Sequence, residues 1–414
     1  MKYEFPKDFL WGAATASHQV EGNNLNDWAV WEKENAGRLA GKARSEFGHL
    51  PIWKNISEET TAPENYISGS ACDHYHKYKE DFALAKSLGH NATRFSIEWS
   101  RIEPSQGKFD EKEIEHYRDA VKTCRENGLE PFVTLWHWTI PLWLRDKGGV
   151  SSHSFANHFA IYAKRMAKEL PEVKFWITLN EPEIYTAHSY FKGVWPPQKK
   201  SPIKYLRALK NLIRAHKKTY KLIKEITPLA HIGIAKNNIH FEPADEDFTN
   251  HLLAFFADIW WNNFFLWRIR KFQDFIGLNH YFHNRINYGF NKNRNEKTSD
   301  MGWELCPEAI YHCLIGLKKY GKPIYITENG LADTKDEKRE WFIKESLKNV
   351  HRAIKEGTDV RGYLHWSLMD NFEWDKGFWP RFGLIEIDYK TLERRPRPSA
   401  YAYKKIIEDN GIIE

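Results

Sequence analysis

Residues 92–136 read ATRFSIEWSRIEPSQGKFDEKEIEHYRDAVKTCRENGLEPFVTLW, and they hold one complete repeat of the pattern that decides the fold. A β-branched and aromatic run at residues 92–97 is followed by helical periodicity over residues 111–127. Gly128 ends the helical pattern, and a second apolar run occupies residues 131–136. This order is typical of a βαβ unit, in which a helix connects two parallel strands.

The same unit recurs along the whole chain. We expect strands at residues 10–14, 92–97, 131–136, 175–179, 232–235, 275–279, 324–327 and 362–366. Helical segments follow them, for example at residues 73–88, 111–127, 155–169, 205–226, 307–320 and 338–355, several of which end at a glycine. Eight such units predict an α/β fold, a (β/α)8 TIM barrel with its active site at the C-terminal ends of the strands. We find no linker, so we expect one domain over residues 1–414.

Composition narrows the possible functions. The 414 residues are 42% hydrophobic and 28% charged, and the net charge of +6 comes from scattered positive residues. No basic stripe of the kind that binds nucleic acid is present. No Gly-rich phosphate loop follows a strand, and no apolar run of about 18 residues occurs, so we expect neither a nucleotide cofactor nor a transmembrane segment.

Cysteine usage and the first residues bear on location. The four cysteines form no Cys-x-x-Cys pair, and residues 1–6 lack the apolar stretch of a signal peptide. A cytoplasmic location fits both features. Few Cys and Met with abundant Lys, Arg and Glu are typical of thermophilic proteins.

Two predicted strands end in a glutamate. Residues 175–182 read FWITLNEP and end the fourth strand at Glu181, and residues 323–330 read PIYITENG and end the seventh at Glu328. Pro182 disfavours a helical conformation at Glu181, so we expect this residue to be extended and to point out of the barrel mouth. Each glutamate could instead cap a helix N-terminus. Two carboxylates in matching positions favour glycoside hydrolysis, which needs such a pair.

The surrounding motifs make a specific resemblance. Residues 178–182 (TLNEP) and 326–330 (ITENG) match the two catalytic signatures of glycoside hydrolase family 1. Residues 9–22 (FLWGAATASHQVEG), 94–101 (RFSIEWSR) and 366–374 (WSLMDNFEW) resemble other motifs of that family. The chain therefore resembles a family 1 β-glycosidase of the β-glucosidase or β-galactosidase type over nearly its whole length, and archaeal hyperthermophile members in particular.

The resemblance implies a retaining mechanism with a covalent glycosyl-enzyme intermediate. Glu328 would be the nucleophile and Glu181 the general acid/base, about 5–5.5 Å apart. Glu328 must be ionised at rest, whereas burial and the charge of Glu328 should raise the pKa of Glu181. Residues that the resemblance implies as catalytic support are Arg94, Asn180, Asn279 and Tyr281.

The expected substrate is a small β-glycoside or oligosaccharide with a terminal non-reducing β-D-glucosyl or galactosyl residue. Glucose, galactose, fucose and mannose remain open, and we expect no cofactor and no metal. By the same resemblance, the substrate-binding residues are Gln19, His137, Trp138, Trp366, Glu373, Trp374 and Phe382.

Position 139 differs from the family pattern, and the stretch from Phe241 to Lys271 is shorter than the family usually shows between its fifth and sixth strands. Thr139 stands where many relatives carry Asp after the His-Trp pair. The segment from Phe255 to Lys271 is rich in aromatic residues and ends in a basic flank. It is either a packed barrel helix or an exposed surface that makes peripheral contact with lipid or hydrophobic aglycones.

Two other functions remain possible at this point. A transglycosylase would share every residue of the site. A catalytically silent sugar-binding barrel would gain nothing from a second buried carboxylate.

Overall fold

The computed structural model describes residues 2–413, and its main sheet is a closed parallel barrel in the order β10-β11-β2-β3-β4-β5-β6-β8. Every expected strand is present. The observed bounds are β2 Leu10–Ala14, β3 Ala92–Ser96, β4 Glu130–Thr134, β5 Phe175–Asn180, β6 His231–Asn237, β8 Ile276–His280, β10 Ile324–Asn329 and β11 Val360–Trp366. The predicted (β/α)8 barrel is confirmed.

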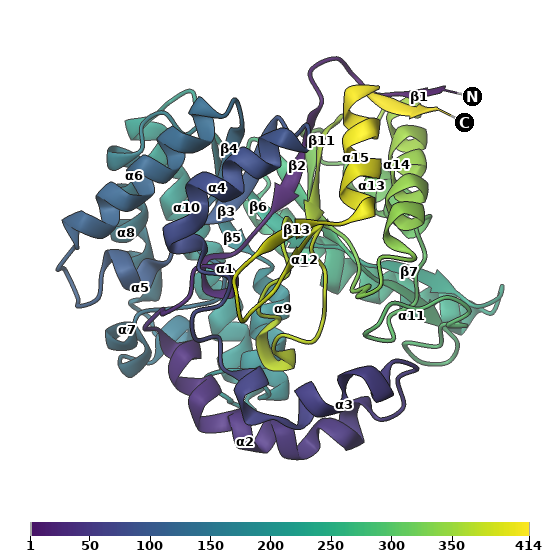
Figure 1. The fold of residues 1–414 in the computed structure, drawn as a ribbon, viewed down its shortest axis with the longest axis horizontal. Helices are drawn as coiled ribbons and strands as arrows, with labels where there is room; N and C mark the ends of the chain where they lie inside the picture. The colour runs from purple at the N-terminus through teal and green to yellow at the C-terminus, as the bar shows by residue number, and fades with distance from the viewer. Residues whose placement is uncertain (1, 414) are drawn as a thin grey trace.

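Helices surround this barrel (Figure 1). The outer ones are α4 His74–Ser87, α6 Glu111–Glu126, α8 Phe155–Glu169, α10 Pro202–Ile226, α11 Phe248–Ala257 with η4 Asp258–Asn263 and α12 Phe264–Ile269, α13 Ala309–Lys318, α14 Arg339–Lys355 and α15 Pro398–Glu408. Gly89, Gly128, Gly321 and Gly357 follow four of them with φ of 82°, 70°, 60° and 81°. Glycine adopts this left-handed conformation without steric cost, which is why the helices end there.

The remaining elements lie in the loops and at the chain ends. The helices are α1 Ser17–Val20, α2 Asp27–Phe47, α3 Trp53–Thr61, η1 Pro63–Tyr66, α5 Trp99–Ile102, α7 Leu142–Asp146, η2 Gly149–Ser151, α9 Pro182–Thr186, η3 Ala187–Lys192 and η5 Trp374–Lys376. Two-stranded sheets pair β1 Lys2–Glu4 with β14 Gly411–Ile413, β7 His240–Pro243 with β9 His283–Ile286, and β12 Ile385–Ile387 with β13 Arg394–Pro396. The first of these holds the two chain ends together (Figure 1).

The barrel interior is apolar toward the N-terminal ends of the strands and polar toward their C-terminal ends. A cluster of inward-facing side chains fills the apolar part: Ala92, Phe132, Ile177, Ala235, Phe275, Tyr325 and Leu364. Two residues further along their strands, Arg94 and Thr134 meet, with the guanidinium Nε donating to the hydroxyl at 3.0 Å. Because side chains alternate along a strand, both layers face the same interior. The polar layer therefore lies toward the C-terminal ends of the strands.

The two strands that carry the glutamates are irregular near their ends. The register between β5 and β6 shifts between Ile177 and Asn180, and the register between β10 and β8 shifts between Ile326 and Glu328. Irregularities of this kind redirect side chains at barrel rims. They bring the polar residues of both strand ends to the mouth of the barrel.

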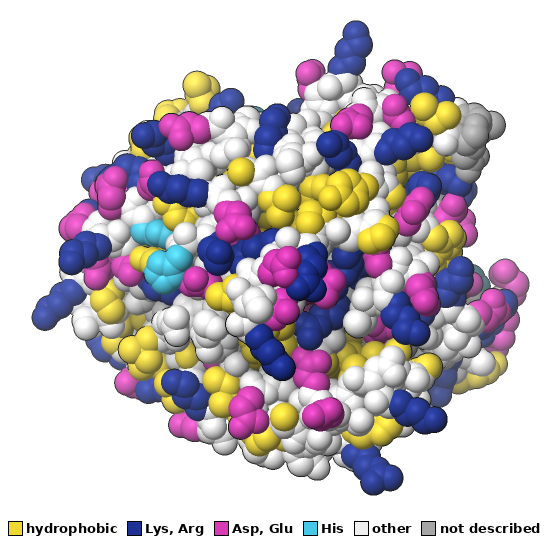
Figure 2. All heavy atoms as spheres, in the orientation of Figure 1, with side chains coloured by type: hydrophobic (Ala, Val, Ile, Leu, Met, Phe, Trp, Pro, Cys, Tyr) yellow, Lys and Arg dark blue, Asp and Glu magenta, His cyan; other side chains and the backbone are white. Residues whose placement is uncertain are grey.

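The surface carries mixed charges. Figure 2 shows Lys and Arg side chains interspersed with Asp and Glu over the visible face. Within residues 2–413 no helix is both long enough and apolar enough to cross a membrane. The cysteines are all free: Cys72, Cys124, Cys306 and Cys313.

Candidate active site

Glu328 lies at the end of β10 with a cation and a phenol against its carboxylate. The Arg94 guanidinium, from the middle of β3, forms an ion pair with Oε1, and the Tyr281 hydroxyl donates to Oε2 at 2.7 Å. Arg94 is fully buried, and only 4% of Glu328 is exposed. Burial raises the pKa of Glu328, while the charge of Arg94 and the hydrogen bond from Tyr281 oppose that rise. Both contacts stabilise the ionised carboxylate.

Glu181 follows β5 in a different environment. Its Oε1 accepts hydrogen bonds from two amides, Asn279 Nδ2 at 3.0 Å and Asn237 Nδ2 at 3.2 Å. Burial first, and then the negative charge of Glu328, raises the pKa of Glu181 to about 8. A carboxyl with this pKa is protonated at neutral pH. Of the two glutamates, only Glu328 has a cation in direct contact, so the resting pair is one acid and one carboxylate.

Two asparagines connect these carboxyl groups. Asn180 accepts from Arg94 NH2 at 2.7 Å and from Asn279 Nδ2 at 3.1 Å through the same oxygen. Asn279, whose Nδ2 also bonds Glu181, accepts from the Thr327 hydroxyl at 2.7 Å. The residues that the sequence named as catalytic support therefore meet in one network around both glutamates.

The backbone of Glu181 differs from the expected conformation. We predicted an extended residue before Pro182, but Glu181 has φ 41° and ψ 60°, in the left-handed region. A proline disfavours the right-handed helical conformation at the residue before it, and here that residue is left-handed rather than extended. Its amide donates to Ala235 O at 2.8 Å. Left-handed non-glycine residues are strained and concentrate at functional sites.

Comparison with known proteins places this arrangement in a family. A family model described as glycosyl hydrolase family 1 matches residues 1–272 and 266–412. The chain belongs to glycosyl hydrolase family 1. This family 1 enzyme is 34% identical to a 1,4-beta-D-glucan glucohydrolase of Thermotoga neapolitana, over 99% of this chain and all of the relative. It is 29% identical to a beta-galactosidase of Saccharolobus solfataricus, over 100% of this chain and 96% of that relative.

Solved structures agree with this assignment. A beta-glycosidase from Pyrococcus horikoshii superposes with a TM-score of 0.88 at 38% identity, over 100% of this chain and 97% of that one. A family 1 β-glucosidase from Thermotoga maritima gives 0.86 at 30% identity, covering both chains fully. The family 1 enzyme is thus a retaining β-glycosidase.

The polar residues expected to bind sugar line the mouth of the family 1 barrel. Gln19 Nε2 donates to Asn371 Oδ1, Phe372 O and Glu373 Oε2 at 2.8, 2.9 and 3.3 Å. His137 Nε2 lies 3.0 Å from Asn180 Nδ2. Gln19 Oε1 and His137 Nδ1 are buried and have no hydrogen-bond partner. Such atoms are costly unless a ligand or water satisfies them.

The charge states of this rim follow from burial. Burial lowers the pKa of His137 well below its usual value, so the ring is neutral. Burial and the charges of Glu328, Asp375 and Glu181 raise the pKa of Glu373 to about 8. Both groups can therefore donate a hydrogen bond to a hydroxyl oxygen at neutral pH.

Aromatic rings enclose the same mouth. The indole of Trp374 packs on Trp138 with centroids 4.7 Å apart and stacks on His137 at 5.9 Å, and Trp366 stacks on His137 at 6.0 Å. Phe382 lies 6.4 Å from Tyr281, edge to face. All the aromatic residues that the sequence predicts to bind substrate thus lie in one region of the family 1 enzyme.

Sequence reasoning missed Asn237 and Trp261. Asn237 ends β6 and donates to Glu181, and the indole Nε1 of Trp261 donates to Asn237 Oδ1 at 3.2 Å. The strand-end rule that identified Glu181 would have identified Asn237. Trp261 gave no comparable signal, since it lies in a run of aromatic residues. Within residues 2–413, no group of His, Cys, Asp or Glu side chains is placed to hold a metal ion.

The aromatic segment from Phe255 to Lys271 is partly exposed. Phe265, Leu266 and Ile269 are fully buried against the barrel. Phe255 and Phe256, however, are 58% and 57% exposed, and Trp260 and Trp267 are 39% and 40% exposed. The helical segment from Phe255 to Lys271 therefore packs against the protein on one face and exposes aromatic side chains to solvent on the other.

Proposed function

We propose that Glu328 is the nucleophile and Glu181 the general acid/base of a double displacement. The observation that carries this proposal is the asymmetry of the pair, in which Arg94 contacts Glu328 while burial holds Glu181 protonated. In the first step Glu328 attacks the anomeric carbon, and the Glu181 proton moves to the leaving oxygen. The proposal requires carboxyl groups about 5–5.5 Å apart.

Hydrolysis of the intermediate reverses these roles. Esterification removes the charge of Glu328, so the pKa of Glu181 falls and the group becomes a base. It then takes a proton from water as the water attacks the anomeric carbon and the bond to Glu328 breaks. The Tyr281 hydroxyl and the Arg94 guanidinium stabilise the departing carboxylate.

We propose a terminal non-reducing β-D-glucosyl or galactosyl residue as the substrate group. Relatives named for both sugars support this, as do the unpartnered Gln19 Oε1 and His137 Nδ1 at the mouth. Hydroxyls of the sugar would bond Gln19, His137, Asn180 and Glu373, and Trp366 and Trp374 would pack on its apolar face.

A panel of p-nitrophenyl β-glycosides tests this proposal. Hydrolysis of the glucoside or galactoside with first release of the β-anomer, seen by NMR, is the expected result. First release of the α-anomer would refute the retaining assignment of Glu181 and Glu328. Products formed with added alcohol measure the competing transglycosylation.

We further propose that the enzyme is a single cytoplasmic domain over residues 1–414 that makes peripheral contact with anionic lipid. Rings continue from Phe191 through Tyr205 to Trp260 with centroids 5.7 and 6.4 Å apart, and Trp260 packs on Phe264 at 4.5 Å. Arg268 lies over Phe264, 3.5 Å from the ring centroid. Exposed rings beside basic groups favour a lipid interface.

Co-sedimentation with anionic vesicles measures this contact. The double variant Phe255→Ser/Phe256→Ser should bind less lipid than the wild type. Leu229→Ser is the matched control, because Leu229 is 91% exposed and lies outside the segment. Equal sedimentation of wild type and double variant, or no sedimentation of the wild type, would refute the contact.

A further inference from the structure

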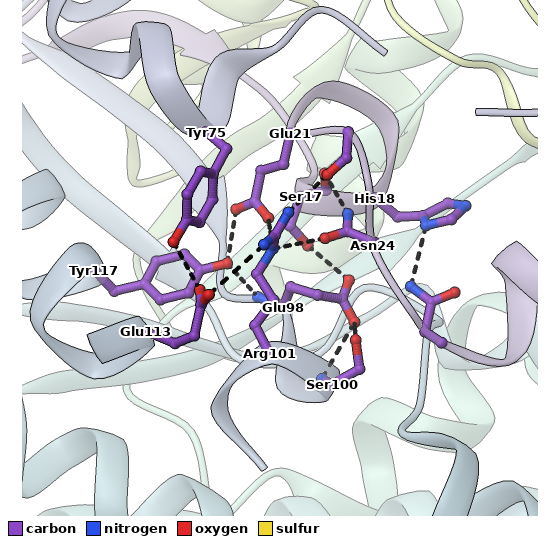
Figure 3. A network of polar contacts seen from close by, with 12 residues as sticks. Ser17, His18, Glu21, Asn24, Tyr75, Glu98, Ser100, Arg101, Glu113 and Tyr117 are labelled. Carbon is purple, nitrogen blue, oxygen red and sulfur yellow. Dashed lines mark hydrogen bonds and ion pairs between the residues drawn. The ribbon is translucent and has the colours of Figure 1, made fainter. Parts of the chain in front are cut away.

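A buried carboxylate outside the catalytic pair joins two segments of the sugar site. Glu98 follows β3 and is fully buried. Its Oε2 accepts from the Ser17 hydroxyl at 3.3 Å (Figure 3). The same oxygen accepts from the Thr139 hydroxyl at 2.9 Å. Its Oε1 accepts from the Ser100 hydroxyl at 2.8 Å, the Ser100 amide at 3.3 Å and Thr139 at 3.1 Å. All of these donors are neutral, and they converge on one side chain.

Two of the donors lie close in sequence to residues that face the sugar. Ser17 is the first residue of α1, and Gln19 follows two positions later on the same short helix. Thr139 follows His137 by two positions on the loop after β4. A movement of either hydroxyl relative to Glu98 is therefore passed through two residues of backbone to Gln19 or His137.

The contact with α1 is reinforced from β3. The Ser17 amide donates to the Ser96 hydroxyl at 2.7 Å, and that hydroxyl donates to the Ser17 hydroxyl at 2.9 Å. The hydroxyl of Ser17 is then free to donate only to Glu98. This chain of bonds fixes the first turn of α1 against the end of β3 in one arrangement.

A neighbouring carboxylate serves a different contact. Glu21 accepts from Arg101 Nε at 3.1 Å and from the Tyr117 hydroxyl at 2.7 Å (Figure 3). Arg101 NH2 also donates to Gly22 O at 2.6 Å. These bonds hold the end of α1 against α6 rather than against the loop after β4. Glu98 is thus the carboxylate that connects α1 with Thr139.

We propose that Glu98 is a positioning residue that sets the spacing of Gln19 and His137 for the sugar. This inference rests on the proposed function of those two residues. A carboxylate has about four acceptor sites, enough for the converging donors, whereas an amide would direct N–H groups at hydroxyls that need acceptors. The Thr139 hydroxyl lies 3.1 and 2.9 Å from the two oxygens of Glu98, so a carboxylate at position 139 would reach the same place from the other side.

Relocation of the carboxylate tests the proposal. Glu98→Gln should lower kcat/KM for p-nitrophenyl β-glucoside by roughly 10- to 100-fold, the usual effect of losing hydrogen bonds to a charged group. Thr139→Asp should lower it similarly, because two carboxylates would then face each other. The kcat/KM of the double variant Glu98→Ser/Thr139→Asp should be at least about tenfold higher than that of the less active of Glu98→Gln and Thr139→Asp. No recovery in the folded double variant would refute the inference.

A second pair of variants covers the case in which Glu98 variants do not fold. Thr139→Val removes the hydroxyl at nearly constant volume, and Thr139→Ser retains it. The serine variant should keep kcat/KM within about twofold of the wild type, while the valine variant should lose roughly tenfold. Equal activity of the two would overturn the proposal, as would a lower melting temperature of Thr139→Val with unchanged kcat/KM.

Gln19→Ala separates this inference from the proposed function. If Gln19→Ala leaves kcat/KM unchanged, the proposed sugar site is wrong. If Gln19→Ala lowers kcat/KM, the loss of kcat/KM caused by Glu98→Gln should be clearly smaller in the Gln19→Ala background. In that background Glu98 can affect sugar binding only through His137. Equal effects of Glu98→Gln in both backgrounds would refute the positioning role alone.

Discussion

Neutralising Glu328 should lower the pKa of Glu181 by about two units. The pKa of Glu181 is raised to about 8, against about 4.3 for an exposed glutamate. Two unit charges about 5 Å apart interact by about 3 kcal/mol at an effective dielectric constant of about 20. This energy corresponds to about two pH units, so the pKa should fall to about 6. It should not fall further, since burial is the larger cause of the shift.

Two pH profiles of the same enzyme measure this change. The profile of kcat/KM reports Glu181 in the free enzyme, where Glu328 is charged, and should decline as pH rises through about 8. A 2-deoxy-2-fluoro-glucosyl group trapped on Glu328 removes the charge. Hydrolysis of this ester needs Glu181 as a base and should rise with pH through about 6. A single midpoint near 8 in both profiles would show that Glu328 does not set the pKa of Glu181.

Three further variants test separate parts of the structure. Glu328→Gly should lose hydrolysis, and azide should restore turnover with the α-glycosyl azide as product; a β-azide would exclude the nucleophile role. Tyr281→Phe removes a hydrogen bond that lowers the pKa of Glu328, so the acidic limb of kcat/KM should move to higher pH, and an unmoved limb would contradict this. Burial raises the pKa of Asp27 to about 7, so the folded wild type binds more protons than the unfolded chain between about pH 4 and 7 and loses stability as pH rises. As the pH rises from 4 to 8, the stability of Asp27→Asn relative to the wild type should increase by on the order of 4 kcal/mol in urea unfolding, and a constant difference would refute the assignment.

The barrel could be predicted from sequence because each strand is buried on both faces. Such strands appear as short, nearly continuous apolar runs, such as residues 324–327. Helix ends could be predicted equally well, since Gly89 and Gly128 adopt the left-handed conformation that ends a helix. The long helix α2 was missed because it lies in the loop after β2, outside the βα repeat. Its first turn packs at the mouth, where Trp28 lies 4.6 Å from Trp374.

The site residues were visible where they end a strand, and harder to see where only tertiary contact gives them a role. Glu98 and Thr139 lie in recognisable motifs, yet nothing local in the chain indicates that their side chains meet. Trp261 acts through Asn237, which is 24 residues away. The prediction of an extended Glu181 was wrong. Pro182 acts only against the right-handed helical conformation. The left-handed conformation that Glu181 adopts is accompanied by a tertiary hydrogen bond from its amide to Ala235 O, which the local sequence does not indicate.

The two glutamates proposed as catalytic illustrate why the chemistry of this site depends on the closed barrel. Each lies at the C-terminal end of an apolar strand beside an asparagine, so the local sequence does not predict different charges for them. The difference arises from Arg94, which is 234 residues from Glu328 and reaches it because β3 and β10 close into the same barrel. The charge on Glu328 in turn raises the pKa of Glu181, which has amide donors and no cation in contact. Removing the guanidinium should therefore perturb both carboxyl groups, and a defect in nucleophilic attack and a displaced basic limb should appear together.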